Sequence, residues 1–368
     1  MADAEDIPEP DRVGDAPHPR HTSALFGQKA AETAFLDAVA HGHMHHAWLL
    51  TGPSGVGKAT LAWRIARYLI GQGPVAPVPP DLNMSPDNLT FRRVAALGEP
   101  RLFLCRRPWN DKTKKLSASI TVDEVRKLKS FFTLSAADGG WRVAIVDAAD
   151  DLNVSAANAL LKILEEPPDN AAILLIAHQP GKLLPTIRSR CRTLALQHLC
   201  VGDLAQALSQ IGMEPPANIE ALHQITEGSV GQAVQFLGGD GAEIYAAITH
   251  VLSGGTRMDR PAILALAEAC TGRGAEPRFT LTRHLIHLAL ARLAKSPVTP
   301  GGLPEATTGE ARVHQQLAPN PAAAVIWANL AQELSARTAH AVAVNLDPSH
   351  VILDTFLQIE ATAAKATA

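Results

Sequence analysis

The chain has 368 residues, 46% of them hydrophobic, and a formal net charge of −3 at pH 7. That length can bury two or three cores, since a domain commonly holds about 100–200 residues. The near-neutral charge excludes a basic surface spread over the whole chain, so any contact with nucleic acid must be local or shared with partner proteins.

The composition also excludes two other classes of protein. No apolar run reaches the roughly 18 residues of a membrane span, and the N-terminus lacks a signal-type apolar region. The four cysteines are scattered, so they form neither a disulfide framework nor CxxC zinc pairs. We therefore expect a soluble cytoplasmic protein, rich in helices, with free thiols and no membrane contact.

The first part of the chain predicts a tail, a helix and a strand. Residues 1–22 contain proline, aspartate and histidine without periodicity, which predicts a flexible tail. Between Leu25 and His43 the apolar residues recur at helical spacing, and residues 47–50 form a short apolar run typical of a buried strand.

This strand leads directly into a glycine-rich loop, with a helix predicted from Leu61 to about Ile70. The loop and the start of the helix read Gly52, Pro53, Ser54, Gly55, Val56, Gly57, Lys58, Ala59 and Thr60. Such a P-loop lets backbone N–H groups approach phosphate oxygens, and its lysine pairs with the β- and γ-phosphates. The alternative is a glycine turn that only packs a strand onto a helix.

One position of the P-loop departs from the usual pattern. The residue after the lysine normally supplies a hydroxyl to Mg²⁺, and here it is Ala59. Thr60 lies about 100° further round the helix, so we expect it to be a poor replacement.

The composition changes over residues 71–115, which we interpret as an insert rich in proline and arginine. Its prolines are Pro74, Pro77, Pro79 and Pro80, and its basic residues are Arg92, Arg93, Arg101, Arg106, Arg107, Lys112, Lys114 and Lys115. The local positive charge is compatible with a contact to DNA or to a partner. A solvated insertion loop is the interpretation we favour.

The stretch from Trp141 to Arg192 predicts the second half of an α/β core. An apolar run over residues 143–146 ends on Asp147, at the strand end where open α/β sheets hold their ligands. A helix follows over residues 153–166 and is stopped by two prolines. A second buried strand over residues 172–177 leads to Ser189-Arg190-Cys191.

After Thr193 only helical patterns continue. We predict a small helical domain over residues 197–240, with helices at 201–212, 218–226 and 229–237. Residues 241–368 predict a third, all-helical domain, whose last helix begins at Pro348. The α/β core itself is then expected over residues 23–196.

Together these motifs resemble the bacterial clamp-loader subunits of the AAA+ class. The resemblance is carried by the P-loop, by Asp147, by residues 158–168 and by residues 186–191. It is tightest over residues 25–195. It implies a P-loop (AAA+) core with a parallel sheet, then a small helical lid and an all-α C-terminal collar that holds a ring of subunits.

The resemblance also implies partners and limits the cofactors. The partners would be the ATP-hydrolysing and clamp-opening subunits of a hetero-oligomeric ring, with the sliding clamp reached indirectly and primer–template DNA bound through the assembled complex. ATP could bind without efficient hydrolysis, Mg²⁺ would be held poorly, and zinc is not expected, because only Cys105 stands where many relatives have four cysteines. Whether nucleotide binds at all stays open at this stage.

Several residues of the hydrolysing members of the family are missing. Asp147 is followed by Ala148 instead of a glutamate, and His178 is not the usual polar residue after the second strand. The lid segment 228–231 reads Gly-Ser-Val-Gly and lacks the arginine of hydrolysing members. Loss of one group that stabilises the transition state lowers a rate by about 10²–10³-fold, so little hydrolysis is expected from this chain alone.

Arg190, in contrast, is retained. In the family the arginine of the Ser-Arg-Cys motif projects into the nucleotide site of the neighbouring subunit, where such a residue can raise the rate about 10³–10⁵-fold. The alternative for Arg190 is a structural arginine bound to local carbonyl groups.

Rival functions for the whole chain are an ATP-hydrolysing motor subunit and a small-molecule kinase. The two extra helical domains and the Ser-Arg-Cys motif argue against the kinase.

Overall fold

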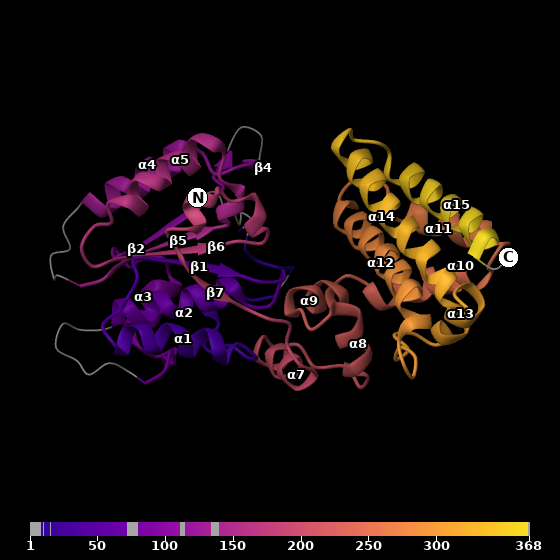
Figure 1. Cartoon of the computed structure of the whole chain (residues 1–368), viewed down its shortest axis with the longest axis horizontal. Coiled ribbons are helices and arrows are strands. Elements are labelled where there is room, and N and C mark those ends of the chain that lie inside the picture. Colours follow the sequence, from indigo (N-terminus) through magenta and orange to yellow (C-terminus); the bar gives the residue numbers. More distant parts are fainter. Residues whose placement is uncertain are drawn as a thin grey trace, which may run out of the picture. The chain divides into compact units, whose positions relative to one another are not determined.

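The computed structural model describes residues 9, 11–14, 16–71, 80–110, 115–133 and 140–366. The chain divides into two compact units (Figure 1). The first comprises Met1–Pro215 and Gly228–Gly231, and the second comprises Pro216–Glu227 and Gln232–Ala368. The helical lid expected over residues 197–240 is thus shared between the two units.

The first unit is built on a parallel sheet, which in the described residues has five strands in the order β2-β5-β6-β1-β7. The strands are β1 (Ala47–Thr51), β2 (Leu102–Arg106), β5 (Arg142–Asp147), β6 (Ala171–Ile176) and β7 (Arg192–Ala195). All six residues of β6 are buried. Such continuous apolar runs are typical of a parallel sheet covered on both faces, which confirms the predicted α/β core.

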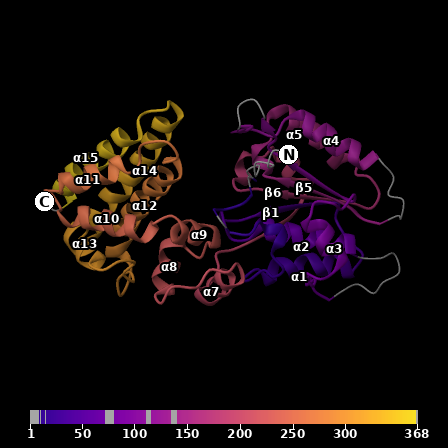
Figure 2. The same cartoon turned by 180° about the vertical axis from the view of Figure 1, so that it is seen from behind.

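Helices cover both faces of this sheet (Figures 1 and 2). One layer holds α1 (Lys29–Ala40), α2 (Lys58–Gly71) and α3 (Leu89–Ala95), and the other holds α4 (Val122–Thr133) and α5 (Val154–Glu165). Helix α5 begins where Asn153 caps it by accepting a hydrogen bond from the backbone N–H of Ala156. Its Leu160 and Ile163 pack into the core that also contains Val146 of β5.

Residues 71–115 do not form the single insertion loop that we predicted from the sequence. They contain α3, the edge strand β2 and a short antiparallel hairpin of β3 (Trp109–Asn110) and β4 (Lys115–Leu116). Strand β2 pairs in parallel with β5 and buries Cys105 completely. Its apolar run is short and lies between arginines, so periodicity did not reveal it. The interpretations of Pro74, Pro77, Pro79, Lys112 and Lys114 fall outside the described residues.

The described part of residues 1–22 is also not a loose tail. It forms a short 3₁₀ helix at Pro19–His21, and the side chain of His18 is buried edge-on against the ring of Trp63. Arg67 of α2 donates hydrogen bonds to the carbonyl oxygens of Arg20 and Thr22 at 2.8 and 2.7 Å. These contacts come from α2, far along the chain, so a local sequence pattern could not predict them.

The remaining helices follow β6, and those from α7 onwards lie in segments that were predicted to be helical. They are α6 (Pro185–Arg188), α7 (Val201–Gln210), α8 (Ile219–Thr226), α9 (Val230–Gly238), α10 (Gly241–Ser253), α11 (Arg260–Glu268), α12 (Glu276–Lys295), α13 (Glu310–Leu317), α14 (Pro321–Ala343) and α15 (Pro348–Ala366). In the second unit Trp327 is fully buried and donates from its indole N–H to the Leu317 carbonyl oxygen at 2.7 Å. Among the described residues no helix is both long and apolar enough to span a bilayer.

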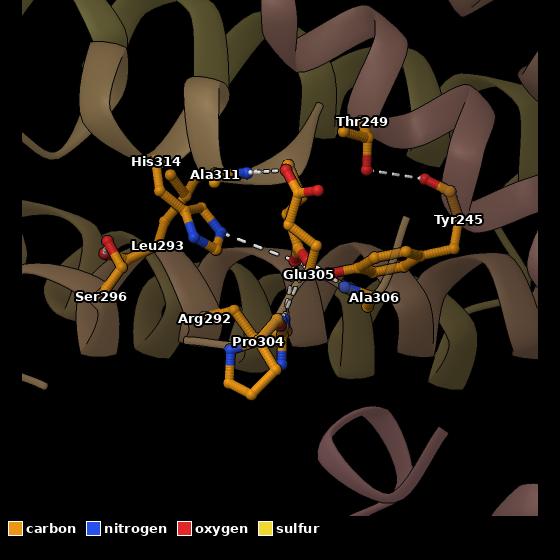
Figure 3. A network of polar contacts seen from close by, with 11 residues as sticks. Tyr245, Thr249, Arg292, Leu293, Ser296, Pro304, Glu305, Ala306, Ala311 and His314 are labelled. Atoms are coloured by element: carbon orange, nitrogen blue, oxygen red, sulfur yellow. Dashed lines mark hydrogen bonds and ion pairs between the residues drawn. The ribbon is translucent and has the colours of Figure 1, made fainter. Parts of the chain in front are cut away.

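A buried polar network joins α10, α12 and α13 inside the second unit (Figure 3). Arg292 donates from Nε and Nη2 to the two carboxylate oxygens of Glu310 at 2.6 and 2.9 Å. The same carboxylate accepts from the hydroxyl of Tyr245 at 2.6 Å and from the backbone N–H of Ala306 at 2.7 Å. Burial alone would raise the pKa of Glu310, but these donors and the charge of Arg292 hold it below its ordinary value.

Candidate functional site

The P-loop connects β1 to α2 in the geometry that the sequence predicted. Gly52, Gly55 and Gly57 have φ angles of 131°, 74° and 102°, a region that residues with a side chain rarely adopt. A Cβ atom on Gly52 would lie 2.3 Å from the Leu196 carbonyl oxygen, so glycine is required there. The loop therefore presents its backbone at the N-terminus of α2, an arrangement that fits a phosphate group.

The chain's own residues 229–231 pack against this loop. The hydroxyl of Ser229 donates to the carbonyl oxygen of Ser54 at 2.8 Å, and the backbone N–H of Gly231 donates to the carbonyl oxygen of Gly55 at 3.0 Å. A Cβ atom on Gly231 would lie 2.9 Å from the Cα of Gly55. Gly231 stands where hydrolysing members have an arginine, and in this conformation it leaves no room for a side chain.

Lys58 is buried and contacts the P-loop itself. Its Nζ donates to the carbonyl oxygens of Gly52 and Pro53 at 2.7 and 2.5 Å. Burial lowers the pKa of its amine to about 8, although the carboxylates of Asp147 and Asp150 act in the opposite direction. A phosphate that enters the loop must therefore displace the two carbonyl contacts of Lys58.

Asp147 ends β5, as predicted, but it does not form a good Mg²⁺ site. Its side chain is buried, and its Oδ2 finds no hydrogen-bond partner among the described residues. Burial, with smaller effects of Asp11 and Asp151, raises the pKa of this carboxyl to about 8, which favours the protonated form. Because Ala59 offers no hydroxyl and a protonated carboxyl is a poor ligand, the residues present fit a phosphate better than its metal ion.

The two acids that follow β5 are occupied by other contacts. The carboxylate of Asp150 accepts from the backbone N–H groups of His178 and Gln179, each at 3.0 Å. Asp151 pairs with Arg107 across 3.2 Å. Asp150 therefore fixes the turn after β6, and the exposed His178 contributes its backbone to that turn. Neither acid stands in for the glutamate that Ala148 replaces.

Arg190 lies in the turn after α6, where Ile187 is fully buried and Cys191 packs against the core. Its Nη1 donates to the carbonyl oxygen of Thr186 at 3.0 Å, and its Nη2 lies 2.9 Å from Oε1 of Glu165 at the end of α5. The side chain remains 37% exposed, and that of Glu165 remains 48% exposed. The backbone of Arg190 is thus fixed by the packing of its neighbours, whereas its guanidinium group makes only solvent-accessible contacts.

Sequence reasoning missed a group of charged residues beside Asp147. Arg106 is the register partner of Asp147 in the β2–β5 pair, and it contacts Glu9 and Asp11 of the N-terminal segment. Arg101 pairs with Glu99 at 3.0 Å, and Arg92 pairs with Asp87 at 2.8 Å. Most of the arginines that suggested a nucleic-acid surface therefore have a carboxylate of the same chain as partner. Within the described residues no group of three or more His, Cys, Asp or Glu could hold a metal ion.

Comparison with known proteins gives the family context. Residues 27–200 match the family described as "DNA polymerase III, delta subunit". The chain is 37% identical to DNA polymerase III subunit delta' of Pseudomonas aeruginosa over 192 residues, which are 50% of this chain and 53% of that relative. It is 28% identical to subunit tau of Escherichia coli over 268 residues, which are 70% of this chain and 39% of that protein.

A gamma subunit-related protein of Thermotoga maritima is similar to the chain with a TM-score of 0.38 and 16% identity, over 91% of this chain and 100% of that one. The chain spans about half the length, or less, of the curated relatives named here. The match over residues 27–200 coincides with the P-loop and the parallel sheet described above. Through this region the chain is similar to the delta' and tau subunits of DNA polymerase III.

Proposed function

We propose that this chain acts as a delta'-like subunit of the clamp loader of DNA polymerase III. In this role it would supply Arg190 as an arginine finger to the nucleotide site of a neighbouring ATPase subunit while a sliding clamp is loaded on primed DNA. Its neighbours would be gamma/tau and delta subunits in a hetero-oligomeric ring, and it would not act as an independent catalyst.

The contacts of Arg190 carry this proposal. A guanidinium has five N–H donors in a planar fork that suits phosphate oxygens, and only two contacts tie this one to its own chain in the described structure. Exposed ion pairs contribute about 0–1 kcal/mol, so Glu165 can give way to a phosphate, whose hydrogen bonds to a charged donor contribute about 1.5–3 kcal/mol each.

The condition of the chain's own pocket supports the same role. Ala59, Ala148 and Gly231 each replace a group used by hydrolysing relatives, and Lys58 is turned onto loop carbonyls. These substitutions leave Arg190 and its contacts unchanged. A subunit that completes a neighbouring site needs its finger and a rigid core behind it, and it does not need hydrolysis of its own.

DNA contact would be local and would not read sequence. The exposed face of α5 carries Lys162, which we propose as one of the contacts to the phosphates of primer–template DNA in the assembled ring. The slightly negative net charge is compatible with this, because the other subunits would share the contact.

A second candidate function is an ATP-hydrolysing, gamma/tau-like motor subunit. The complete set of P-loop glycines with Lys58 favours it, as does the similarity to subunit tau. Steady-state hydrolysis by the isolated chain separates the two functions. Clear turnover that is abolished by Lys58→Ala would establish the motor and displace the finger as the chain's main activity.

The decisive experiment reconstitutes the complete clamp loader with Arg190→Ala and measures DNA-stimulated ATP hydrolysis. We expect hydrolysis at the adjoining site to fall by about 10³–10⁵-fold, so that the total rate falls by the share of that site. Arg188→Ala is the matched control, because Arg188 is an exposed arginine two residues away in the same turn. Equal rates for wild type and Arg190→Ala in a fully assembled complex would refute the proposal.

A further inference from the structure

Helix α11 of the second unit has one exposed side with an ordered set of residues. The helix packs against α15, and both views show the two side by side (Figures 1 and 2). Arg260, Leu264 and Glu268 are exposed, and Leu264 is 46% exposed despite its large apolar side chain. Because these three residues follow one another at a spacing of four, a cation, an apolar group and an acid lie in this order along one side of α11.

The apolar part of this side continues onto α15. Leu357 is 50% exposed, and Ala361 and Ala364 are exposed on the same helix. These three residues line a hollow of about 560 Å³, which Arg257 and Arg260 line from the N-terminal end of α11. Exposed apolar side chains that gather beside a hollow are typical of a surface that another protein covers.

The hollow has an excess of positive charge. Arg260 donates to one carboxylate oxygen of Glu360, and the other oxygen accepts from the backbone N–H of Met258 at 2.9 Å. Arg257 is exposed, and its guanidinium group has no partner among the described residues. Two arginines thus stand against one glutamate. Since a guanidinium binds a carboxylate through two parallel hydrogen bonds, this end of α11 is suited to an acidic side chain.

The opposite end of α11 carries such an acid. Glu268 is the last residue of the helix, and in the described part of the chain nothing pairs with its exposed carboxylate. The helix dipole disfavours an acid at the C-terminus and a cation at the N-terminus, so neither Glu268 nor Arg260 stabilises α11 by its position. Leu264 lies midway between them. The surface is therefore complementary to itself when it is turned end for end.

We propose that this surface, which we call the α11 face and define as Arg257, Arg260, Leu264, Glu268 and Leu357, binds the same face of a second copy of the chain. In a two-fold arrangement the two α11 helices run antiparallel, and Leu264 meets its own copy at the axis. Glu268 of each copy then lies against Arg257 and Arg260 of the other. Packed helices lie about 8–10 Å apart, a distance that arginine and glutamate side chains can bridge.

The order of the charges favours a second copy over a different partner. Any other protein would need an acid, an apolar residue and a cation at matching spacing, and the chain itself supplies them. A stable interface has about 20–30 residues on each side, and the α11 face has fewer. The dimer should therefore be reversible, with a dissociation constant in the micromolar range.

Sedimentation equilibrium of the full-length chain with reversed charges tests the proposal. Glu268→Arg sets arginine against arginine, and Arg257→Glu sets glutamate against glutamate, so each should weaken dimerisation by about tenfold or more. The double variant restores opposite charges with reversed polarity and keeps the net charge of the wild type. It should dimerise about tenfold more tightly than either single variant. Glu333→Arg on the exposed side of α14 is the control for net charge and should dimerise like the wild type.

Recovery in the double variant cannot arise from misfolding, because a second substitution at the opposite end of α11 would not repair a fold. Three results would overturn the proposal: a wild type that stays monomeric up to about 1 mM, a Glu268→Arg variant that dimerises as tightly as the wild type, or a double variant no tighter than the single ones.

A different occupant of the α11 face would also be detected. If the wild type is monomeric alone and Leu264→Glu prevents its incorporation into a reconstituted clamp loader, the face binds another subunit and the proposal is wrong. The proposal concerns the second unit and the chain without partners, so its failure leaves the role proposed for Arg190 unchanged.

Discussion

Two arginine–glutamate pairs in this chain have the same chemistry but differ in how far they are buried. Arg292 and Glu310 in the second unit are 4% and 3% exposed, and every carboxylate oxygen meets a donor. Arg190 and Glu165 in the first unit are 37% and 48% exposed and share a single contact of 2.9 Å. The Arg292–Glu310 pair is buried in a core, and the Arg190–Glu165 pair lies at the surface.

The difference shows how burial decides what an arginine can do. Removing one partner of a buried pair leaves an uncompensated charge and destabilises a protein by about 3–5 kcal/mol, whereas exposed pairs contribute about 0–1 kcal/mol. Arg292 therefore cannot leave Glu310 without unfolding its surroundings. Arg190 can exchange its carboxylate for another anion, and that freedom is what a finger acting in trans requires.

The largest expected effect is on stability in the second unit. Arg292→Ala should lower the free energy of unfolding by about 3–5 kcal/mol, because Glu310 stays buried without its cation. Urea unfolding of the full chain measures this. The matched control is Arg337→Ala, which removes an exposed bidentate pair with Asp354 at 2.7 and 3.0 Å and should change stability by less than about 1 kcal/mol. Equal losses in both variants would show that burial is not what separates the pairs.

The next effect concerns a buried acid that lacks a strong cation partner. In the folded chain the pKa of Asp147 is raised by burial to about 8 from its ordinary value of 3.8. Between these values the folded state binds a proton that the unfolded state has lost, so this carboxyl makes stability fall as the pH rises from about 4 to about 8.

Asp147→Asn removes that dependence. The variant should be more stable than wild type at pH 9 by several kcal/mol, since each pKa unit of the shift corresponds to about 1.4 kcal/mol, and the difference should vanish towards pH 4. Urea unfolding at pH 4.5, 7 and 9 checks this, with Asp37→Asn as the exposed control. A variant that is less stable than wild type at pH 9 would mean that the carboxylate is well compensated and that the pocket is closer to a working Mg²⁺ site than we infer.

The smallest effect is expected at the exposed pair. Glu165→Gln keeps an acceptor of similar shape and removes the charge that competes with phosphate for Arg190. Since such a pair contributes about 0–1 kcal/mol, the DNA-stimulated hydrolysis of the reconstituted complex should rise by up to about fivefold, with folding stability unchanged. The same substitution at the neighbouring Glu166 should have no effect. A fall in rate with Glu165→Gln would mean that the carboxylate orients the arginine rather than competing for it.

The candidate site was partly readable from the sequence because its key motifs are local. The P-loop needs glycines at fixed spacing, and the structure shows why at Gly52, Gly55 and Gly57. The strand that ends on Asp147 was recognisable as an apolar run of buried length. What the sequence did not reveal is which residues pack against the loop, since Ser229 and Gly231 come from more than 170 residues further along the chain.

The sequence by itself indicated strands β1, β5 and β6, most of the helices and the motifs, because these depend on periodicity and on backbone needs within a few residues. It did not indicate α3 or β7. Only the tertiary structure decided the edge strand β2, the packing of residues 16–22 and the partner of each arginine. A short strand forms where a neighbouring strand offers it hydrogen bonds. A charged side chain is exposed or buried according to which other segments pack against it. Both depend on contacts between distant segments, which no local pattern records.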